Sequence, residues 1–153
     1  MISFAEQAVR LAAENADAGQ LPFAALVIRN DAIIATGVNT SLRDGDALAH
    51  AEVAAVRNAT MATGLSDLSG AVLVSSCEPC ALCHAAAVAV GITRIVYAAG
   101  KELVPDLGRP GPVATVELMK QMQASLRALT PSEITQFSVA NAGEPFDRFL
   151  RQA

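Results

Sequence analysis

The chain alternates short apolar runs with segments of helix-forming residues, and this alternation limits its fold more than any other feature. Turn residues such as Gly, Pro and the Asn30–Asp31 pair separate the segments. Their periods and compositions predict helix 2–18, strands 23–30 and 31–37, loop 37–48, helix 49–63, strand 70–76, helix 79–91, strand 93–99, loop 101–112, helix 113–129, strand 133–139 and helix 144–153. Strands that alternate with helices favour an α/β fold with a mostly parallel sheet covered on both faces, and the opening hairpin makes that sheet mixed.

Length and charge narrow the class of protein. The chain has 153 residues, so we expect a single domain over 1–153, and 52% hydrophobic residues are enough for a core. A net charge of -4 disfavours a broad nucleic-acid-binding face. No basic segment precedes an apolar run at the start, and His84, Gly91 and Arg94 interrupt the longest apolar stretch. We therefore expect a cytoplasmic protein with no signal peptide and no membrane span.

One His and two Cys form a candidate metal site. Cys80 and Cys83 stand three apart at the start of a predicted helix, so both can face one ion, and His50 begins another predicted helix. Zn²⁺ takes thiolate and imidazole ligands, and three protein ligands leave a fourth position open, as in catalytic sites. Glu52 would then lie beside a water whose pKa zinc lowers, where a carboxylate can carry protons to a substrate nitrogen. The pattern H-x-E with P-C-x-x-C is a known signature of zinc deaminases.

Other interpretations of these residues exist. A lone C-x-x-C is often a redox pair or two buried thiols, but a redox pair leaves His50 and Glu52 unexplained. Cys77 lies before the Pro at a strand end, so we expect it to point elsewhere and not to bind the metal. His84 lies about 100° around the helix from Cys83, so we expect a packed or exposed side chain there.

At these residues the chain resembles the cytidine and deoxycytidylate deaminase superfamily, over segments between residues 21 and 99. The resemblance implies the three-layer α-β-α fold of that superfamily, with a five-stranded mixed sheet. It implies one Zn²⁺ on His50, Cys80 and Cys83, with Glu52 as the catalytic proton carrier. It also implies that the backbone N–H groups near Ala51 and Cys80 help to position water and substrate.

Within the superfamily, "LPFAALVIRNDAII", "AHAEVAAVRNA" and "SSCEPCALC" resemble guanine deaminases and related nucleobase deaminases. This resemblance implies that Asn39 hydrogen-bonds the base and that Phe23 and Ala24 lie at the pocket, Ala24 in place of the usual Gly. Bacterial tRNA adenosine deaminases share the metal motifs, but they more often have Val after the Pro and a basic C-terminal helix.

The C-terminal part fits its relatives less well. Guanine deaminases of this kind use a C-terminal aromatic residue and an acidic residue after the fourth strand to recognise the base. Here Phe146 and Phe149 are the candidates for a lid, and Asp106 is the candidate for a contact with an exocyclic amine. The alternative is that the two Phe anchor a terminal helix and that Asp106 is solvated.

We therefore expect a zinc aminohydrolase that acts on a free nucleobase, with guanine or a related amino-purine or triazine first, and releases ammonia. The alternatives are a tRNA adenosine deaminase, a cytosine or cytidine deaminase and a zinc-stabilised module without catalysis. The resemblance also implies a homodimer. The one-methylene differences between related bases change discrimination by only about 1–3 kcal/mol, so the sequence does not fix the base.

Overall fold

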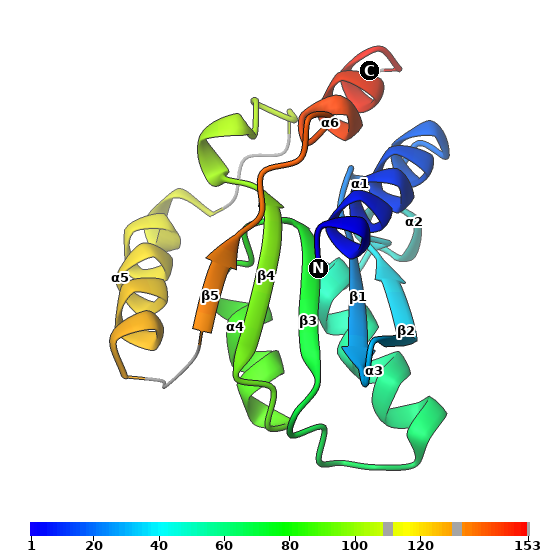
Figure 1. Cartoon of the computed structure of the whole chain (residues 1–153). Coiled ribbons are helices and arrows are strands. Elements are labelled where there is room, and N and C mark those ends of the chain that lie inside the picture. Colours follow the sequence, from blue (N-terminus) through cyan, green and yellow to red (C-terminus); the bar gives the residue numbers. More distant parts are fainter. Residues whose placement is uncertain (109–111, 130–132, 153) are drawn as a thin grey trace.

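The computed structural model describes residues 1–108, 112–129 and 133–152 (Figure 1). Residues 109–111 of the predicted loop and the last residue of the predicted final helix lie outside this part of the chain. The helices are α1 (Ile2–Asp17), α2 (Ser41–Asp44), α3 (Ala51–Thr63), α4 (Ala81–Ala89), α5 (Val113–Leu129) and α6 (Glu144–Leu150), with a 3₁₀ turn η1 (Lys101–Leu103). The strands are β1 (Ala24–Arg29), β2 (Ala32–Val38), β3 (Val72–Cys77), β4 (Arg94–Ala99) and β5 (Glu133–Gln136). The predicted order of elements is confirmed, apart from α2 and η1, which lie within predicted loops.

The five strands form one mixed sheet in the order β2-β1-β3-β4-β5. Strands β3, β4 and β5 run parallel, whereas β1 is antiparallel to both β2 and β3. The prediction of a mixed sheet is confirmed, and its antiparallel pairings include that of β1 with β3, which the sequence did not predict. This pairing joins segments far apart in the chain, and the periodicity of one strand does not specify its neighbour.

The hairpin of β1 and β2 follows from its local sequence. Asn30 and Asp31 both have positive φ, 51° and 57°, as a two-residue hairpin turn of the mirror-image type requires. Strand β1 is apolar along nearly its whole length and buried on both faces, whereas β2 at the sheet edge is partly exposed. The hairpin therefore supplies one internal strand and one edge strand.

Helices cover both faces of the sheet and make a three-layer α/β/α fold of the cytidine deaminase type (Figure 1). Helices α1 and α6 pack on one face, over a core that includes Leu26, Val74 and Phe146. Helices α3 and α4 pack on the other face, over a core that includes Val27 and Leu73. Helix α5 lies beyond α4, beside β5 (Figure 1). In the described part of the chain, no helix combines the length and apolar character that a membrane span needs.

Helix α3 approaches the sheet at a glycine. A Cβ atom on Gly37 of β2 would collide with the carbonyl oxygen of Ala51 and the backbone nitrogen of Ala55. Only Gly permits the backbones of β2 and α3 to lie this close. Because α3 begins directly after His50, this contact fixes the height of His50 and Glu52 above the sheet.

Candidate active site

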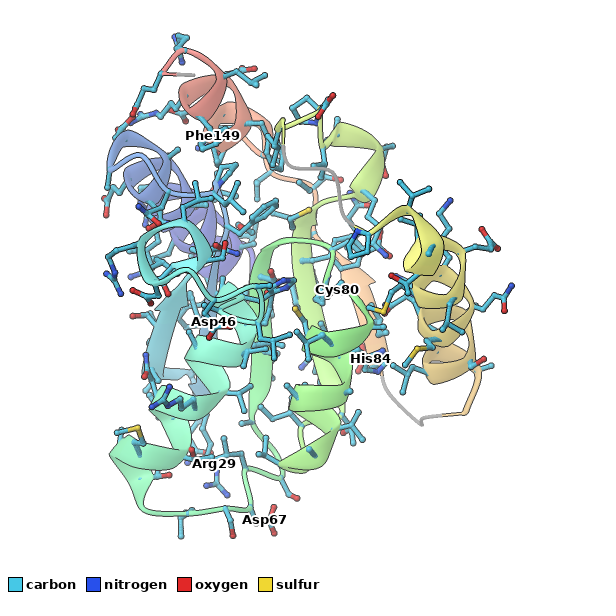
Figure 2. All side chains as sticks on the ribbon, turned by 180° about the vertical axis from the view of Figure 1, so that it is seen from behind. Arg29, Asp46, Asp67, Cys80, His84 and Phe149 are labelled. Atoms are coloured by element: carbon cyan, nitrogen blue, oxygen red, sulfur yellow. The ribbon has the colours of Figure 1, made fainter. Side chains whose placement is uncertain are left out.

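The three predicted metal ligands lie at the starts of two neighbouring helices. His50 is the N-cap residue of α3, Cys80 is the N-cap residue of α4, and Cys83 lies in the first turn of α4. Strand β3 ends at Cys77, and Pro79 then leads into α4, so the site lies at the carboxyl end of a central strand. Figure 2 shows Cys80 at this end of α4, close to the start of α3.

The distances between the ligand atoms fit a tetrahedral zinc site. The Sγ atoms of Cys80 and Cys83 are 3.5 Å apart, and His50 Nδ1 lies 3.6 Å from Cys80 Sγ and 3.4 Å from Cys83 Sγ. Ordinary Zn–S and Zn–N bonds at tetrahedral angles separate two sulfurs by about 3.8 Å, and a sulfur and a nitrogen by about 3.6 Å. The observed distances are close to these values. His50, Cys80 and Cys83 are therefore arranged to hold one zinc ion with its fourth position open.

The protonation of the ligands agrees with metal binding. The hydrogen bond from Cys83 lowers the pKa of Cys80 to about 4, and His50 adds to this effect. The hydrogen bond with Cys80 also raises the pKa of Cys83, and the burial of the Cys83 thiol raises it further. The hydrogen bond with Cys80 raises the pKa of His50. The metal-free site thus holds a thiolate on Cys80 and a proton on Cys83 that zinc must displace.

Glu52 lies in the first turn of α3, with only 5% of its surface exposed. Its Oε1 accepts a hydrogen bond of 2.7 Å from Ser75 Oγ on β3, and its Oε2 accepts one of 3.1 Å from Cys83 Sγ. Ser75 therefore fixes one carboxylate oxygen, while the other faces the ligand cluster. This is the position that a proton-carrying carboxylate needs.

A cavity of about 290 Å³ opens onto the ligands and Glu52. The residues that line it are Leu21, Phe23, Asn39, His50, Glu52, Cys77, Glu78, Cys80, Cys83, Lys101 and Val104. The volume lies at the lower end of the range for small-molecule sites. The cavity therefore suits a small heterocycle better than a large ligand.

Asn39, the predicted base contact, is 4% exposed and lines the cavity. Its Oδ1 accepts hydrogen bonds from the backbone N–H of Ser41, at 3.0 Å, and from Ser41 Oγ, at 2.7 Å. Its backbone N–H donates to the carbonyl of Phe23 at 3.0 Å. With Oδ1 already occupied, Nδ2 is the group that can donate to a ligand.

Phe23 lines the cavity, and Phe146 supports it from behind. The two rings meet edge to face, with centroids 5.9 Å apart. Phe146 is 3% exposed, within the core that α1 and α6 share, and Phe149 is 8% exposed. Neither is among the residues that line the cavity. Both rings are thus buried outside the cavity lining, and the role of a lid stays a prediction.

Three other predicted substrate contacts lie outside the lining of the cavity. Ala24 is fully buried, and its N–H donates to Ser76 Oγ at 3.1 Å. Ala51 is also buried and packs in the core below α3. Asp106 accepts a hydrogen bond of 2.8 Å from the N–H of Gly108, which closes a local turn. Since Ala24 and Ala51 adjoin the lining residues Phe23, His50 and Glu52, they shape the cavity through their neighbours.

Cys77 and His84 are not part of the ligand group, as predicted. Cys77 nevertheless lines the cavity, so the expectation that it points elsewhere was wrong. It does so because the chain turns only after Cys77, at the end of β3. Burial raises the pKa of Cys77 to about 12, so it remains a protonated thiol. His84 is fully buried on α4, and burial lowers its pKa.

Several residues of the site were not predicted from the sequence. Ser75 was detectable in principle, as a polar residue within an apolar strand. Glu78 and Lys101 lie at the cavity, and Lys101 Nζ is 3.8 Å from Glu78 Oε1. Nothing in the local sequence marks Lys101 or Val104, because η1 reaches the site only through the parallel pairing of β3 with β4.

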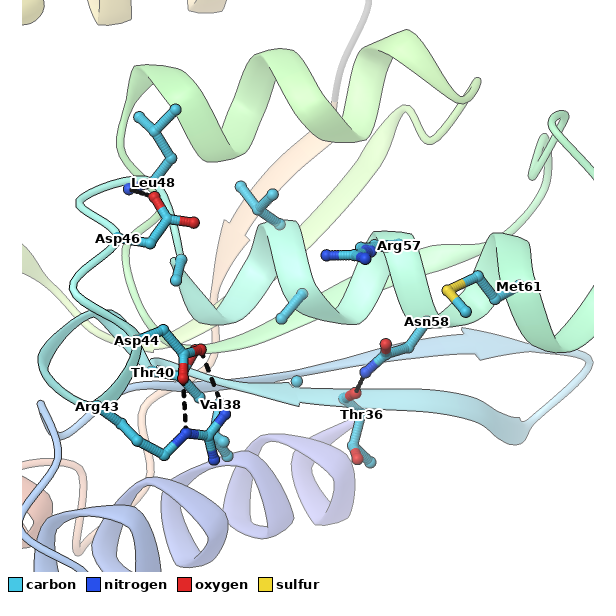
Figure 3. Close-up of a pocket in the computed structure, with 14 residues that line it drawn as sticks. Thr36, Val38, Thr40, Arg43, Asp44, Asp46, Leu48, Arg57, Asn58 and Met61 are labelled. Atoms are coloured by element: carbon cyan, nitrogen blue, oxygen red, sulfur yellow. Dashed lines mark hydrogen bonds and ion pairs between the residues drawn. The ribbon is translucent and has the colours of Figure 1, made fainter.

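Larger hollows lie elsewhere on the described surface. One, of about 610 Å³, runs along the outer side of α3 beside β2, where Arg43 pairs with Asp44 and Asn58 donates to the carbonyl of Thr36 (Figure 3). Another, of about 720 Å³, is an apolar groove between α4 and α5. The residues that line them include neither the ligands nor Glu52. The cavity at the ligands is therefore smaller than these hollows, and it alone of the three contains the zinc ligands and Glu52.

The fold and the His/Cys/Cys site with its buried Glu define a zinc-binding region of the cytidine deaminase type. The family model described as "Cytidine and deoxycytidylate deaminase zinc-binding region" matches residues 2–99. The chain belongs to this family, and the predicted zinc ligands are confirmed with it.

Relatives of this chain include a guanine deaminase, a tRNA-specific adenosine deaminase and a tRNA(Ile)-lysidine synthase. A guanine deaminase of Bacillus subtilis is 40% identical over 98 residues, which are 63% of each chain. A tRNA(Ile)-lysidine synthase of Deinococcus deserti is 42% identical over 103 residues, 67% of this chain but only 19% of that protein. A tRNA-specific adenosine deaminase of Bacillus subtilis is 30% identical over 63% of this chain and 60% of its own. The chain thus spans less than two thirds of the length of these relatives.

Solved structures of deaminases have the same fold as this chain. A guanine deaminase from Nitrosomonas europaea superposes with a TM-score of 0.73 at 26% identity, over 98% of this chain and 82% of that one. A tRNA:A34 deaminase superposes with a TM-score of 0.68 at 27% identity, over 88% of this chain and 97% of that one. The three-layer fold predicted from the resemblance is confirmed.

Proposed function

We propose that this protein is a zinc-dependent hydrolytic deaminase of a free nucleobase, with guanine or a related amino-purine or triazine as its substrate. The observation that carries the proposal is the cavity of about 290 Å³ in which the zinc ligands, Glu52, Asn39 and Phe23 converge. Its size favours a base without a sugar and phosphates. The likeness to guanine deaminases in sequence and structure supports the same substrate class.

In this proposal, zinc, Glu52 and Ser75 have different roles in the deamination. Zinc, when bound, would supply a Lewis acid that lowers the pKa of water toward about 7. Glu52 Oε2 takes a proton from the attacking water and delivers it to the ring nitrogen beside the amino-bearing carbon, as the water oxygen adds to that carbon. The proton of the added hydroxyl then passes through Glu52 to the amino nitrogen, the C–N bond breaks, and ammonia leaves as the ring carbon becomes a carbonyl. Ser75 holds Glu52 Oε1, so the carboxylate keeps Oε2 directed at the water and the leaving group.

The other side chains of the cavity would bind and orient the base. Phe23 offers a ring face or edge on which a planar heterocycle can pack. Asn39 Nδ2 would donate a hydrogen bond to a ring acceptor, because Ser41 occupies its Oδ1. Glu78 and Lys101 at the cavity add an acceptor and a donor. Direct contacts from Ala24, Ala51, Asp106, Phe146 and Phe149 remain predictions.

A substrate panel tests the proposal. Zinc-loaded protein would be assayed for ammonia release with guanine, cytosine, adenine, cytidine and amino-triazines. We expect turnover of one amino-purine or triazine, and its loss by several orders of magnitude in Glu52→Gln with zinc retained. Glu14→Gln, an exposed change on α1, is the matched control and should keep full activity. Release of no ammonia from any base would overturn the proposal.

A second candidate is deamination of adenosine in tRNA. The tRNA-specific adenosine deaminases and the tRNA:A34 deaminase are about as similar to this chain in sequence and fold as some guanine deaminases are. The net charge of -4 is unfavourable for a polyanionic substrate. Salt-sensitive binding of tRNA would favour this candidate, and absence of binding at low salt would exclude it. A cytosine or cytidine substrate is tested by the panel itself, and a zinc module without catalysis predicts no turnover at all.

We also propose that the protein forms a homodimer through the apolar groove between α4 and α5. Leu118 and Met122 on α5 are 54% and 47% exposed, and Leu48, just before His50, is 62% exposed at the same groove. Contiguous exposed apolar surface of this kind is typical of protein interfaces. Light scattering should give twice the chain mass, and Leu118→Glu should give monomers. A wild-type monomer at high protein concentration would contradict the dimer.

A further inference from the structure

Helix α5 is joined to the zinc-ligand turn by polar side chains. Of the side chains described on α5, Gln123 alone is buried, with 8% of its surface exposed. Its Nε2 donates a buried hydrogen bond of 3.1 Å to the carbonyl oxygen of Pro79. One turn further along, Arg127 forms an ion pair and hydrogen bond with the carboxylate of Glu78. Both contacts fall on the two residues that precede the ligand Cys80.

The turn formed by Glu78 and Pro79 determines where Cys80 lies. On one side it is attached to the sheet, because the N–H of Glu78 donates to the carbonyl of Ala99 on β4 at 2.8 Å. Pro79 has no N–H, so its carbonyl is its only backbone hydrogen-bonding group. Gln123 satisfies that carbonyl. The turn is therefore held between β4 and α5, with the zinc ligand directly after it.

The Gln123 amide has a hydrogen-bond partner for its Nε2 but not for its buried Oε1 in the described part of the chain. Rotating the amide would bring Oε1 against the Pro79 carbonyl, two acceptors facing each other, so the donor orientation is fixed. Burying an unpaired acceptor opposes folding, and an apolar side chain of similar length would avoid that cost. What the amide adds over such a side chain is the bond that fixes the Pro79 carbonyl.

We propose that Gln123 is a positioning residue for the zinc site, acting through the Pro79 carbonyl on Cys80, and that Arg127 assists it through Glu78. Neither side chain touches the ion. Zinc affinity therefore depends on the docking of α5, a helix that contributes no ligand. The inference concerns the metal site alone, so it stands or falls apart from the choice of substrate.

The test replaces Gln123 by Met, which keeps the length and removes the donor. Lys120→Met, an exposed change on α5 outside the groove between α4 and α5, is the matched control. Zinc affinity would be measured by chelator competition, and the geometry of the thiolates by the absorption bands of the Co²⁺-substituted protein. Removal of groups that orient metal ligands typically costs 10–100-fold in affinity, so we expect about a tenfold loss in Gln123→Met. We also expect shifted Co²⁺ bands, an unchanged melting temperature of the metal-free protein, and wild-type values in the control.

Arg127 gives an independent comparison, because it is partly exposed and its replacement does not disturb a core. Arg127→Met should lower zinc affinity in the same direction by a smaller factor, and Arg127→Lys should recover part of the loss by keeping the charge near Glu78. Wild-type zinc affinity and Co²⁺ spectra in both Gln123→Met and Arg127→Met would overturn the proposal. A fall in metal-free melting temperature without a change in affinity would overturn it too, since it would mark Gln123 as a stabilising residue only.

Discussion

Gly37→Ala should weaken zinc binding, although Gly37 is no ligand and its backbone φ does not lie in the left-handed region. The added methyl group would collide with Ala51 and Ala55, and it would lie 2.9 Å from the carbonyl carbon of Ala54. Carbon atoms in contact are about 3.5–4.0 Å apart, so α3 must move away from β2 by at least about 0.6 Å. That movement carries His50 with it, because His50 caps α3.

The displacement can be converted into expected magnitudes. Ligand distances in working metal sites vary by only about 0.2 Å, so a shift of 0.6 Å or more is outside that tolerance. Overpacking costs about 1–3 kcal/mol, or about 2–12 °C in melting temperature for a domain of this size. At a free zinc concentration 100 times the dissociation constant, zinc adds about 2.7 kcal/mol of stability. A tenfold weaker site at the same zinc concentration would add only about 1.4 kcal/mol.

Thermal unfolding with and without zinc separates the two effects. The metal-free Gly37→Ala protein should melt below the wild type, and the rise in melting temperature on adding zinc should be about half as large. Gly143→Ala is the control, since Gly143 has a φ of -85° and no heavy atom near its added Cβ. We expect it to stay within about 0.5 kcal/mol of the wild type. A Gly37→Ala protein with wild-type melting temperature and zinc response would refute the close approach of α3 as the cause.

Three further predictions concern the remaining parts of the site. Ser75→Ala should keep zinc but lower turnover by about 10–100-fold, because Glu52 loses the partner of its Oε1; an unchanged rate constant would contradict this role. Phe146→Ala should lower the free energy of unfolding by about 3–5 kcal/mol, because the ring is buried. A higher KM with unchanged stability would instead support a lid. After chelation of the metal, iodoacetamide at neutral pH should label Cys80 first, whose pKa is lowered to about 4, and spare Cys77, whose pKa burial raises to about 12. Mass spectrometry reads the labelled positions, zinc should protect Cys80, and early labelling of Cys77 would count against its burial.

The zinc site was predictable from sequence because each of its parts has a local signature. The spacing of Cys80 and Cys83 fits one helical turn, and Pro79 and His50 stand where helices begin. Glu52 follows in the first turn after His50. The structure confirms that these separate segments meet at one point. The lid role of Phe146 had no comparable local constraint, because a ring at this spacing serves equally well in a core.

The sequence by itself determined the order of helices and strands, the hairpin turn at Asn30–Asp31 and the set of zinc ligands. These depend on side-chain period, turn chemistry and ligand type, which are properties of short segments. Only the tertiary structure decided the antiparallel pairing of β1 with β3, the place of Lys101 at the cavity and the contact of Gln123 with Pro79. Those contacts join residues far apart in the chain, and they depend on which strands become neighbours and on how α5 docks. No local pattern encodes that choice, because it is made by the burial of the whole core.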